Sequence, residues 1–116
     1  MNKIRSLAFA AALLGLLALT ACGSTSSSVQ TVTYDVKITG DTMQPNKLTA
    51  HQGDTVSLTL TADKDEDIHL HGYDYHFQMK AGQKRSKTFT ADKTGTFEIE
   101  IEQTSTHLGE LDVQPR

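Results

Sequence analysis

Histidines are the residues of this chain whose type and spacing are suited to metal chemistry. His69 and His71 are two positions apart in a segment of alternating apolar and polar residues. Residues i and i+2 of a β-strand project from the same face, and neutral imidazoles are good ligands for Cu(II) and Zn(II). The pair is therefore a candidate site for a divalent metal ion. The alternative interpretation is that both are ordinary surface residues on the polar face of a strand.

The other polar candidates are weaker. His76 follows a change of face in the alternating pattern and is expected to be exposed, while His51 lies in a predicted turn and is expected to be solvated. One acidic series alternates with apolar residues, which is typical of a solvated strand face that attracts cations only weakly. The residues of this series are Glu98, Glu100 and Glu102.

The single cysteine, Cys22, closes the run Leu-Thr-Ala-Cys near the N-terminus. Two basic residues and an almost wholly apolar stretch over residues 7–19 precede it, which is the layout of a secretory signal. The run resembles a bacterial lipobox, in which the cysteine thiol receives a diacylglycerol and the cysteine becomes the new N-terminus after cleavage between Ala21 and Cys22. The resemblance implies a signal peptide over residues 1–21 and lipidation of Cys22. The alternative is an ordinary signal peptide with a chance cysteine near its end.

The segment over residues 22–31 would then consist of the lipidated cysteine and a flexible tether rich in Ser and Thr. Two or more acyl chains hold a protein stably on a membrane. We therefore expect a lipid-anchored protein in the cell membrane or the outer membrane, with its domain facing the periplasm or the cell exterior. A lipidated thiol also leaves no cysteine for a disulfide, a nucleophile or a metal centre.

The mature chain is small and acidic. Removing the predicted signal peptide takes two of the eleven basic residues and leaves nine against fourteen acidic residues, which argues against binding to nucleic acid. The acidic run over residues 63–67 lacks the glycine and the final glutamate of an EF-hand calcium loop. The sequence contains no Ser-His-Asp arrangement, phosphate loop or strong zinc-enzyme motif, so we expect no enzyme activity.

Alternating apolar and polar residues dominate the mature chain. Apolar residues recur at every second position over residues 32–38 and again over residues 97–101. Turn residues separate such segments at intervals of about ten residues. The apolar positions change from even to odd across Gly72, which indicates a bulge or a bend there. The pattern predicts one all-β domain over residues 32–116, a β-sandwich or barrel.

Four segments, taken in order, resemble the cupredoxins, the copper-protein sandwiches that include plastocyanin, azurin and cytochrome oxidase subunit II. Residues 44–56 are similar to the opening strand of that family, and His71-Gly72-Tyr73 is similar to the step that carries the first copper ligand. Residues 89–97 are similar to the entry to the copper loop, and residues 107–113 to its exit. The resemblance implies an antiparallel Greek-key β-sandwich of the cupredoxin type over residues 32–116.

The chain departs from this family in the copper loop, which in blue-copper members runs Cys-x-x-His-x-x-Met in its shortest form. Counting forward from the preceding Gly-Thr-Phe turn puts these ligand positions at Ile101, Thr104 and His107. A blue-copper site needs the cysteine thiolate, so electron transfer of that kind is excluded. The resemblance places His107 across from His71 at the old metal pole. The predicted ligands of copper or another divalent ion are therefore His71, His107 and His69.

Two functions remain open from the sequence. The first is an envelope lipoprotein whose cupredoxin-like domain binds Cu(II) or a similar divalent ion for storage, delivery or sensing. The second is a metal-free β-sandwich that serves as an interaction or assembly module at the membrane surface. The sequence identifies no protein partner for either function.

Overall fold

The computed structural model describes residue 23 and residues 27–116 of the chain. The predicted signal peptide and the lipidation site at Cys22 lie outside the described residues, so both stay predictions. The described part contains β-strands and no helix. Consequently, within those residues, no helix is long and apolar enough to cross a membrane. The prediction of an all-β domain is confirmed.

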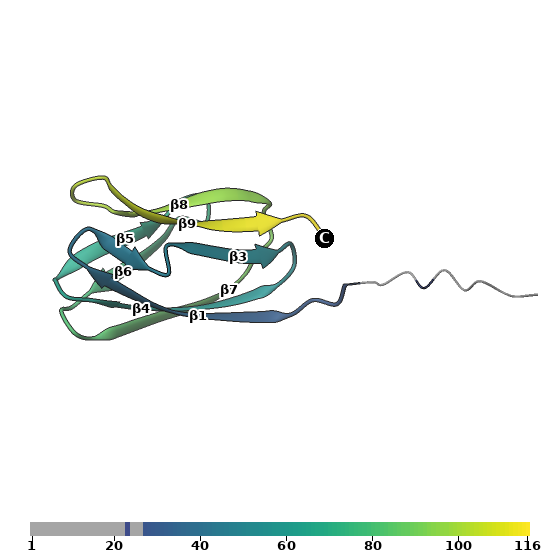
Figure 1. Cartoon of the computed structure of the whole chain (residues 1–116), viewed down its shortest axis with the longest axis horizontal. Helices are drawn as coiled ribbons and strands as arrows, with labels where there is room; N and C mark the ends of the chain where they lie inside the picture. Colours follow the sequence, from purple (N-terminus) through teal and green to yellow (C-terminus); the bar gives the residue numbers. More distant parts are fainter. Residues whose placement is uncertain (1–22, 24–26) are drawn as a thin grey trace, which may run out of the picture.

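The strands of the described residues form two sheets that pack face to face (Figure 1). The smaller sheet has the order β2-β1-β4-β7, and the larger has the order β3-β9-β8-β5-β6. The predicted β-sandwich is thus confirmed. The strand bounds are β1 Thr31–Thr39, β2 Thr42–Gln44, β3 Lys47–His51, β4 Thr55–Ala62, β5 Glu66–Leu70, β6 Tyr75–Met79, β7 Lys84–Thr90, β8 Gly95–Ile101 and β9 Thr106–Gln114.

Both sheets are mixed, whereas the resemblance predicts antiparallel strands throughout. β1 pairs with β4 in parallel, and β3 pairs with β9 in parallel. The other pairings are antiparallel. The alternation of apolar and polar residues identifies the buried face of a strand but is the same for either strand direction. The period-two pattern therefore could not reveal the two parallel pairs.

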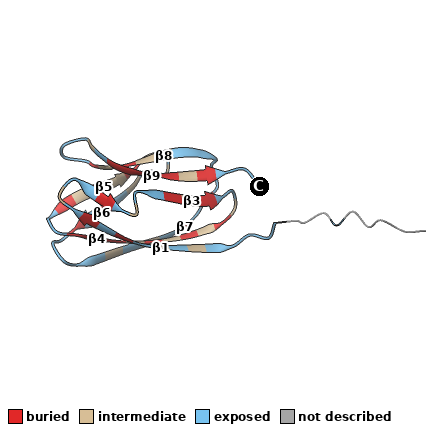
Figure 2. Ribbon diagram, in the orientation of Figure 1, coloured by how far each residue is buried: buried red, intermediate tan, exposed pale blue. Residues whose placement is uncertain are grey.

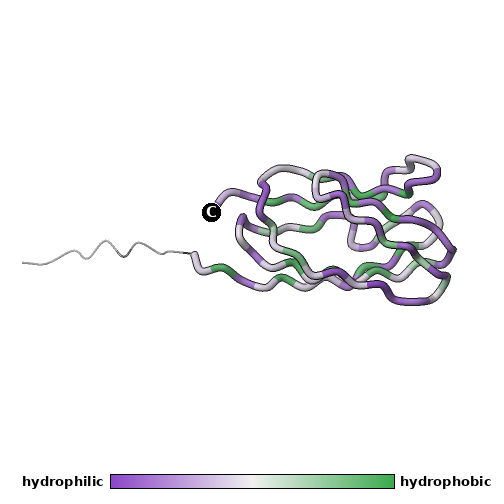
Figure 3. The backbone as a smooth tube through the Cα atoms, turned by 180° about the vertical axis from the view of Figure 1, so that it is seen from behind, coloured by the Kyte–Doolittle hydropathy of each residue, from purple (hydrophilic) through white to green (hydrophobic). Residues whose placement is uncertain are grey.

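The core lies between the two sheets and is built from the alternating apolar residues. Ile38 of β1 and Leu60 of β4 are fully buried, as is Leu111 of β9 on the opposite sheet. Figure 2 shows the buried positions on both sheets, and Figure 3 shows the matching alternation of hydropathy along the chain. Each such side chain stabilises the fold by roughly 1.5–3 kcal/mol when buried. Packing of this core leaves the polar residues of each strand on the outer faces.

The change of face predicted at Gly72 is a hairpin turn between β5 and β6. The two strands pair antiparallel with His69 opposite His76, so even positions of β5 and odd positions of β6 point the same way. Gly72 has a φ of 76°, and a Cβ there would collide with the ring of Phe97. The turn therefore requires glycine. It places the histidines of both strands on one outer face.

The pole at which the N-terminal segment enters the domain is held by the buried Asp54. Its carboxylate accepts hydrogen bonds of 2.9 Å from the backbone amides of Gln30 and His51, and it pairs with the Arg116 guanidinium. The hydrogen bond from Gln30, then that from His51, and then the Arg116 charge hold the pKa of Asp54 below its usual value. This carboxylate thus ties the first strand to the C-terminal residue.

Candidate metal centre

Four of the five histidines lie in or beside β5, β6 and β9 on the outer face of the five-stranded sheet, whereas His51 ends the edge strand β3 of the same sheet. The strand register sets His76 opposite His69, His69 opposite Glu100, and Glu100 opposite His107. These side chains form one row across β6, β5, β8 and β9. We call this region the histidine face; it consists of His69, His71, His76, His107, Asp67, Asp74, Glu98, Glu100 and Glu102.

Each histidine of this face is paired with a carboxylate. His71 Nε2 lies 2.7 Å from Glu100 Oε1, and His107 Nδ1 lies 3.0 Å from Glu98 Oε1. The hydrogen bond to Glu100 is the main reason that the pKa of His71 is raised above its usual value. The negative charges of Glu100, Glu98 and Glu102 raise this pKa further, against the opposing effect of burial. The histidine face is therefore a network of imidazoles paired with carboxylates.

His69 is the most enclosed histidine, with only 13% of its side chain exposed. Its Nε2 lies 2.9 Å from Asp74 Oδ1, and its Nδ1 lies 3.0 Å from Glu102 Oε2. The second contact has the length of a hydrogen bond but not its direction, so Nδ1 has no hydrogen-bond partner among the described residues. A buried polar atom without a partner costs free energy. A metal ion bound to this nitrogen would remove that cost.

Two groups of donors have the spacing of a metal site. The first consists of His69, His71 and Glu100, each of which offers a ligand atom within 4.8 Å of the others. The second consists of His69, Asp74 and His76 at the same spacing. An ion bonded at about 2.0–2.2 Å holds its ligands within about 4.4 Å of one another, so small side-chain movements would close either group. The first group is the better enclosed, because Asp74 and His76 are exposed.

The predicted ligands are not equally close to one another. The rings of His69 and His71 have centroids 4.3 Å apart, so the structure brings this pair together. His107 lies on the same face and opposite Glu100 in the strand register, but its ring is paired with Glu98. Within the described residues, His107 belongs to neither donor group. The structure therefore joins two of the predicted ligands directly and leaves the third beside them.

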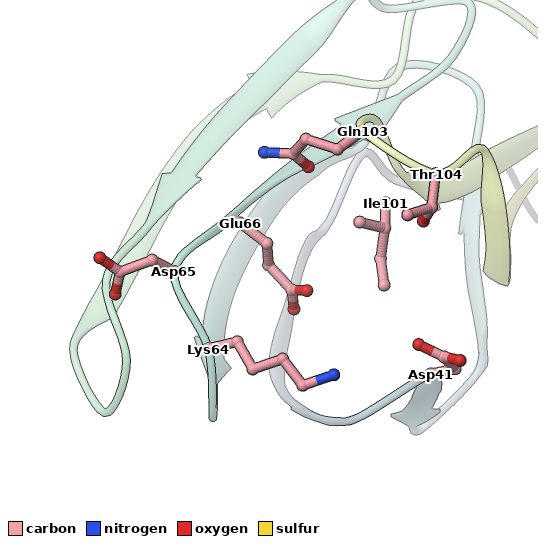
Figure 4. A pocket seen from close by; sticks show the side chains of 7 residues that line it. All are labelled: Asp41, Lys64, Asp65, Glu66, Ile101, Gln103 and Thr104. Atoms are coloured by element: carbon pink, nitrogen blue, oxygen red, sulfur yellow. The ribbon is translucent and has the colours of Figure 1, made fainter.

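Two of the three positions that the family resemblance aligns with the copper loop line a separate hollow at the pole where β8 ends (Figure 4). Ile101 and Thr104 form part of its wall, and the hollow has a volume of about 250 Å³. Glu66 points into it with Oε1 buried and without a hydrogen-bond partner in the part of the chain described, and burial raises the pKa of Glu66. No histidine lines this hollow. The structure thus places His71 and His107 on the sheet face rather than at this pole.

Glu100 and Asp74 are candidate ligands that the sequence analysis missed. The alternation in β8 puts Glu100 on the outer face, but nothing in that pattern shows that β8 pairs with β5. Asp74 lies in the β5–β6 turn with a φ of 56°, a left-handed conformation that few residues other than glycine adopt. Its approach to His69 depends on this turn. For Asp74, the one signal in the sequence was its position between His71 and His76 along the chain.

Comparison with known proteins supports the fold. No family model and no curated protein matches the chain. A copper binding protein in the apo form superposes with a TM-score of 0.63 at 14% identity, covering 72% of this chain and 88% of that one. The metal binding domain of the Streptococcus pneumoniae D39 Cu(I)-exporting P-type ATPase CopA, solved with Cu(I), gives 0.63 at 12% identity, covering 73% and 93%.

A multi-copper oxidase from Pseudomonas thermotolerans gives a TM-score of 0.59 at 19% identity over 77% of this chain. The match covers only 31% of the oxidase, so the chain corresponds to a part of that enzyme. These likenesses bear out the cupredoxin-like β-sandwich that the sequence resemblance implied. At sequence identities of 12%, 14% and 19%, these structural likenesses show the fold alone.

Proposed function

We propose that this domain binds divalent copper or zinc through His69, His71 and Glu100 on its histidine face. The observation that carries the proposal is the spacing of these three donors, all within 4.8 Å of one another. Two imidazoles and one carboxylate are a suitable donor set for Zn(II) and Cu(II), and Cu(II) heads the affinity order of the divalent ions. The solved copper-binding proteins of the same fold support copper as the first ion to test.

The chemistry of the donor set favours storage, delivery or sensing over electron transfer. A blue-copper centre needs a thiolate, and the one cysteine of the chain is the predicted lipidation site. The donors of His71 and Glu100 stand on an outer sheet face, where 42% of the His71 side chain is exposed. An ion held there keeps open coordination positions, so a partner's ligands can exchange with those of the domain.

We also propose that a lipid on Cys22 holds the domain at a membrane of the cell envelope. The support is the run of residues that ends at Cys22 and the Ser- and Thr-rich segment that follows it. Substituting Cys22→Ser in the expressing cell should move the protein from the membrane fraction to the soluble fraction. Radiolabelled palmitate should enter the unsubstituted protein only. Retention of the variant in the membrane fraction would contradict the anchor.

A second candidate function is a metal-free interaction module at the membrane surface. The observation that favours it is that each histidine of the face already pairs with a carboxylate, as His107 does with Glu98. Such a network can exist without an ion, and its charges offer a surface to a polar partner. The two candidates differ in one measurable property, which is the affinity for a divalent ion.

Titration of the full chain in detergent with Cu(II), followed by electron paramagnetic resonance, tests the metal function. We expect a spectrum with nitrogen coupling and an affinity at least tenfold lower in His71→Ala. His51→Ala is the matched control, because His51 ends β3 and belongs to neither donor group. His107→Ala tests the third predicted ligand, for which we expect a smaller loss. Binding no tighter than that of the denatured chain would leave the metal-free module.

A further inference from the structure

We propose that the histidine face holds two divalent ions, with His69 between them. This inference rests on the proposed metal function and adds a second position, formed by His69, Asp74 and His76. The two donor groups share only His69. A neutral imidazole carries a proton on one of its two ring nitrogens and offers a lone pair only on the other. His69 therefore serves both positions as an imidazolate, with the ring proton released to solvent as the second ion binds.

The hairpin between β5 and β6 builds the second position. His69 and His76 are direct partners in the register, and their rings stack with centroids 4.2 Å apart and planes 11° apart. Asp74 Oδ1 lies 2.9 Å from His69 Nε2 and 3.7 Å from His76 Nε2. One carboxylate oxygen therefore faces the Nε2 atoms of both rings. These three atoms are two imidazole donors and one carboxylate donor, the same chemistry as in the first group.

The turn holds Asp74 in the conformation that this position needs. Asp74 has a φ of 56°, in the left-handed region that only a few residue types other than glycine adopt readily. Its side chain is 84% exposed, and aspartate is one of the residue types that adopt this conformation in turns. The turn brings the Asp74 carboxylate to 2.9 Å from His69 Nε2 and 3.7 Å from His76 Nε2.

His69 is in contact with two further imidazoles. His71 lies two residues further along the chain with ring centroids 4.3 Å apart, and His76 lies opposite His69 across the β5–β6 pair at 4.2 Å. Its Nε2 faces Asp74, whereas its Nδ1 is buried beside Glu102 and lacks a well-directed partner among the described residues. Both ring nitrogens are thus placed where a cation would be stabilised by a nearby carboxylate.

The charge of the face is sufficient for two divalent ions. Two such ions bring four positive charges, and a site that collects them without matching anions would repel the second ion. The carboxylates that contact the histidines supply the necessary negative charge. These carboxylates are Asp67, Asp74, Glu98, Glu100 and Glu102.

Binding stoichiometry tests this inference. We would titrate the full chain in detergent with Cu(II) and with Zn(II), using calorimetry and metal analysis after removal of loose ions. We expect two ions per chain in the wild type and one in either His71→Ala or His76→Ala. His69→Ala should lose tight binding at both positions. The matched control His51→Ala should retain two ions.

A second substitution and a spectroscopic measurement guard against misfolding as an explanation. Asp74→Asn changes an exposed turn residue without altering a ring, and it should weaken one of the two ions at least tenfold. Two Cu(II) ions that share His69 lie close enough for magnetic coupling, so the resonance spectrum should broaden between the first and second equivalents and stay uncoupled in His76→Ala.

One ion in the wild type, unchanged by His76→Ala and Asp74→Asn, would overturn the second position while leaving the proposed function intact. No tight ion in the wild type would overturn both.

Discussion

The two outer faces of the sandwich share one strand geometry but differ in the residues that cover them. On the four-stranded sheet, the outward positions of β4 pair mostly with further threonines and serines on β1 and β7, and at the remaining positions with Asp35, Lys37 and Lys84. On the five-stranded sheet, the outward positions of β5, β6 and β8 carry histidines and carboxylates. We call the first of these the threonine face; its β4 residues are Thr55, Ser57, Thr59 and Thr61.

The threonine face shows what folding alone requires of a solvated sheet surface. Threonine is favoured in strands, where it suits a pleated, half-exposed position. The histidine face does not follow this rule. It sets Glu98 directly opposite Glu110, and like charges in that arrangement destabilise a sheet. Lys47 pairs with Glu110 at 3.2 Å and offsets part of this repulsion. The remaining departure from the simpler solution supports the proposed metal binding at the histidine face.

The largest expected effect is the loss of Cu(II) affinity at the histidine face when His69 is removed. We expect His69→Ala to lower the affinity for Cu(II) at least 100-fold, or about 2.7 kcal/mol, because His69 belongs to both donor groups. Ser57→Ala on the threonine face is the matched control and should change the affinity less than twofold. Competition with a chelator of known affinity gives both values, and thermal unfolding shows whether the variants are folded. An equal loss in both variants would abolish the distinction between the faces.

Metal binding should also stabilise the domain through the histidine face alone. An ion at about 100 times its dissociation constant adds about 2.7 kcal/mol to the free energy of unfolding. For a domain of this size, such a gain corresponds to a rise in Tm of roughly 10–20 °C. A chelator should reverse the rise, and Ser57→Ala should show it in full. A rise that persists in His69→Ala would locate the bound ion on another surface.

The stability of the metal-free domain should depend on pH through His71. Its pKa is raised, mainly by the hydrogen bond to Glu100, so the folded state holds this proton more tightly than the unfolded state. The stabilisation is therefore complete below the unfolded pKa of about 6.5 and is lost as pH rises through the folded pKa. Urea unfolding at several pH values should show that His71→Ala has lost this dependence while Ser57→Ala retains it. Identical pH profiles for all three proteins would show that the pair with Glu100 is not formed in solution.

Sequence reasoning reached the fold and part of the site. The period-two pattern gave the all-β class and the buried residues, and it put His69 and His71 on one face. It did not give the partners of β5, because strand register depends on long-range pairing that a single strand does not encode. For that reason the pattern indicates only a solvated residue at Glu100, which β8 sets opposite His69. His76 is exposed, as the pattern predicts, but the pattern does not reveal that the hairpin sets it opposite His69.

The smallest expected effect is a change in the free energy of unfolding when Glu98 on the histidine face is replaced by threonine, the residue typical of the threonine face. We expect Glu98→Thr to raise the free energy of unfolding of the metal-free domain by about 0.5 kcal/mol, because it removes the like-charge contact with Glu110. The lost pair between Glu98 and His107 is exposed on both sides and contributes little. Affinity for Cu(II) should change less than threefold, since Glu98 belongs to neither donor group. Chemical unfolding with and without the ion measures both quantities. If Glu98→Thr instead destabilises the metal-free domain, the carboxylates of this face support the fold itself, and the contrast with the threonine face no longer indicates binding.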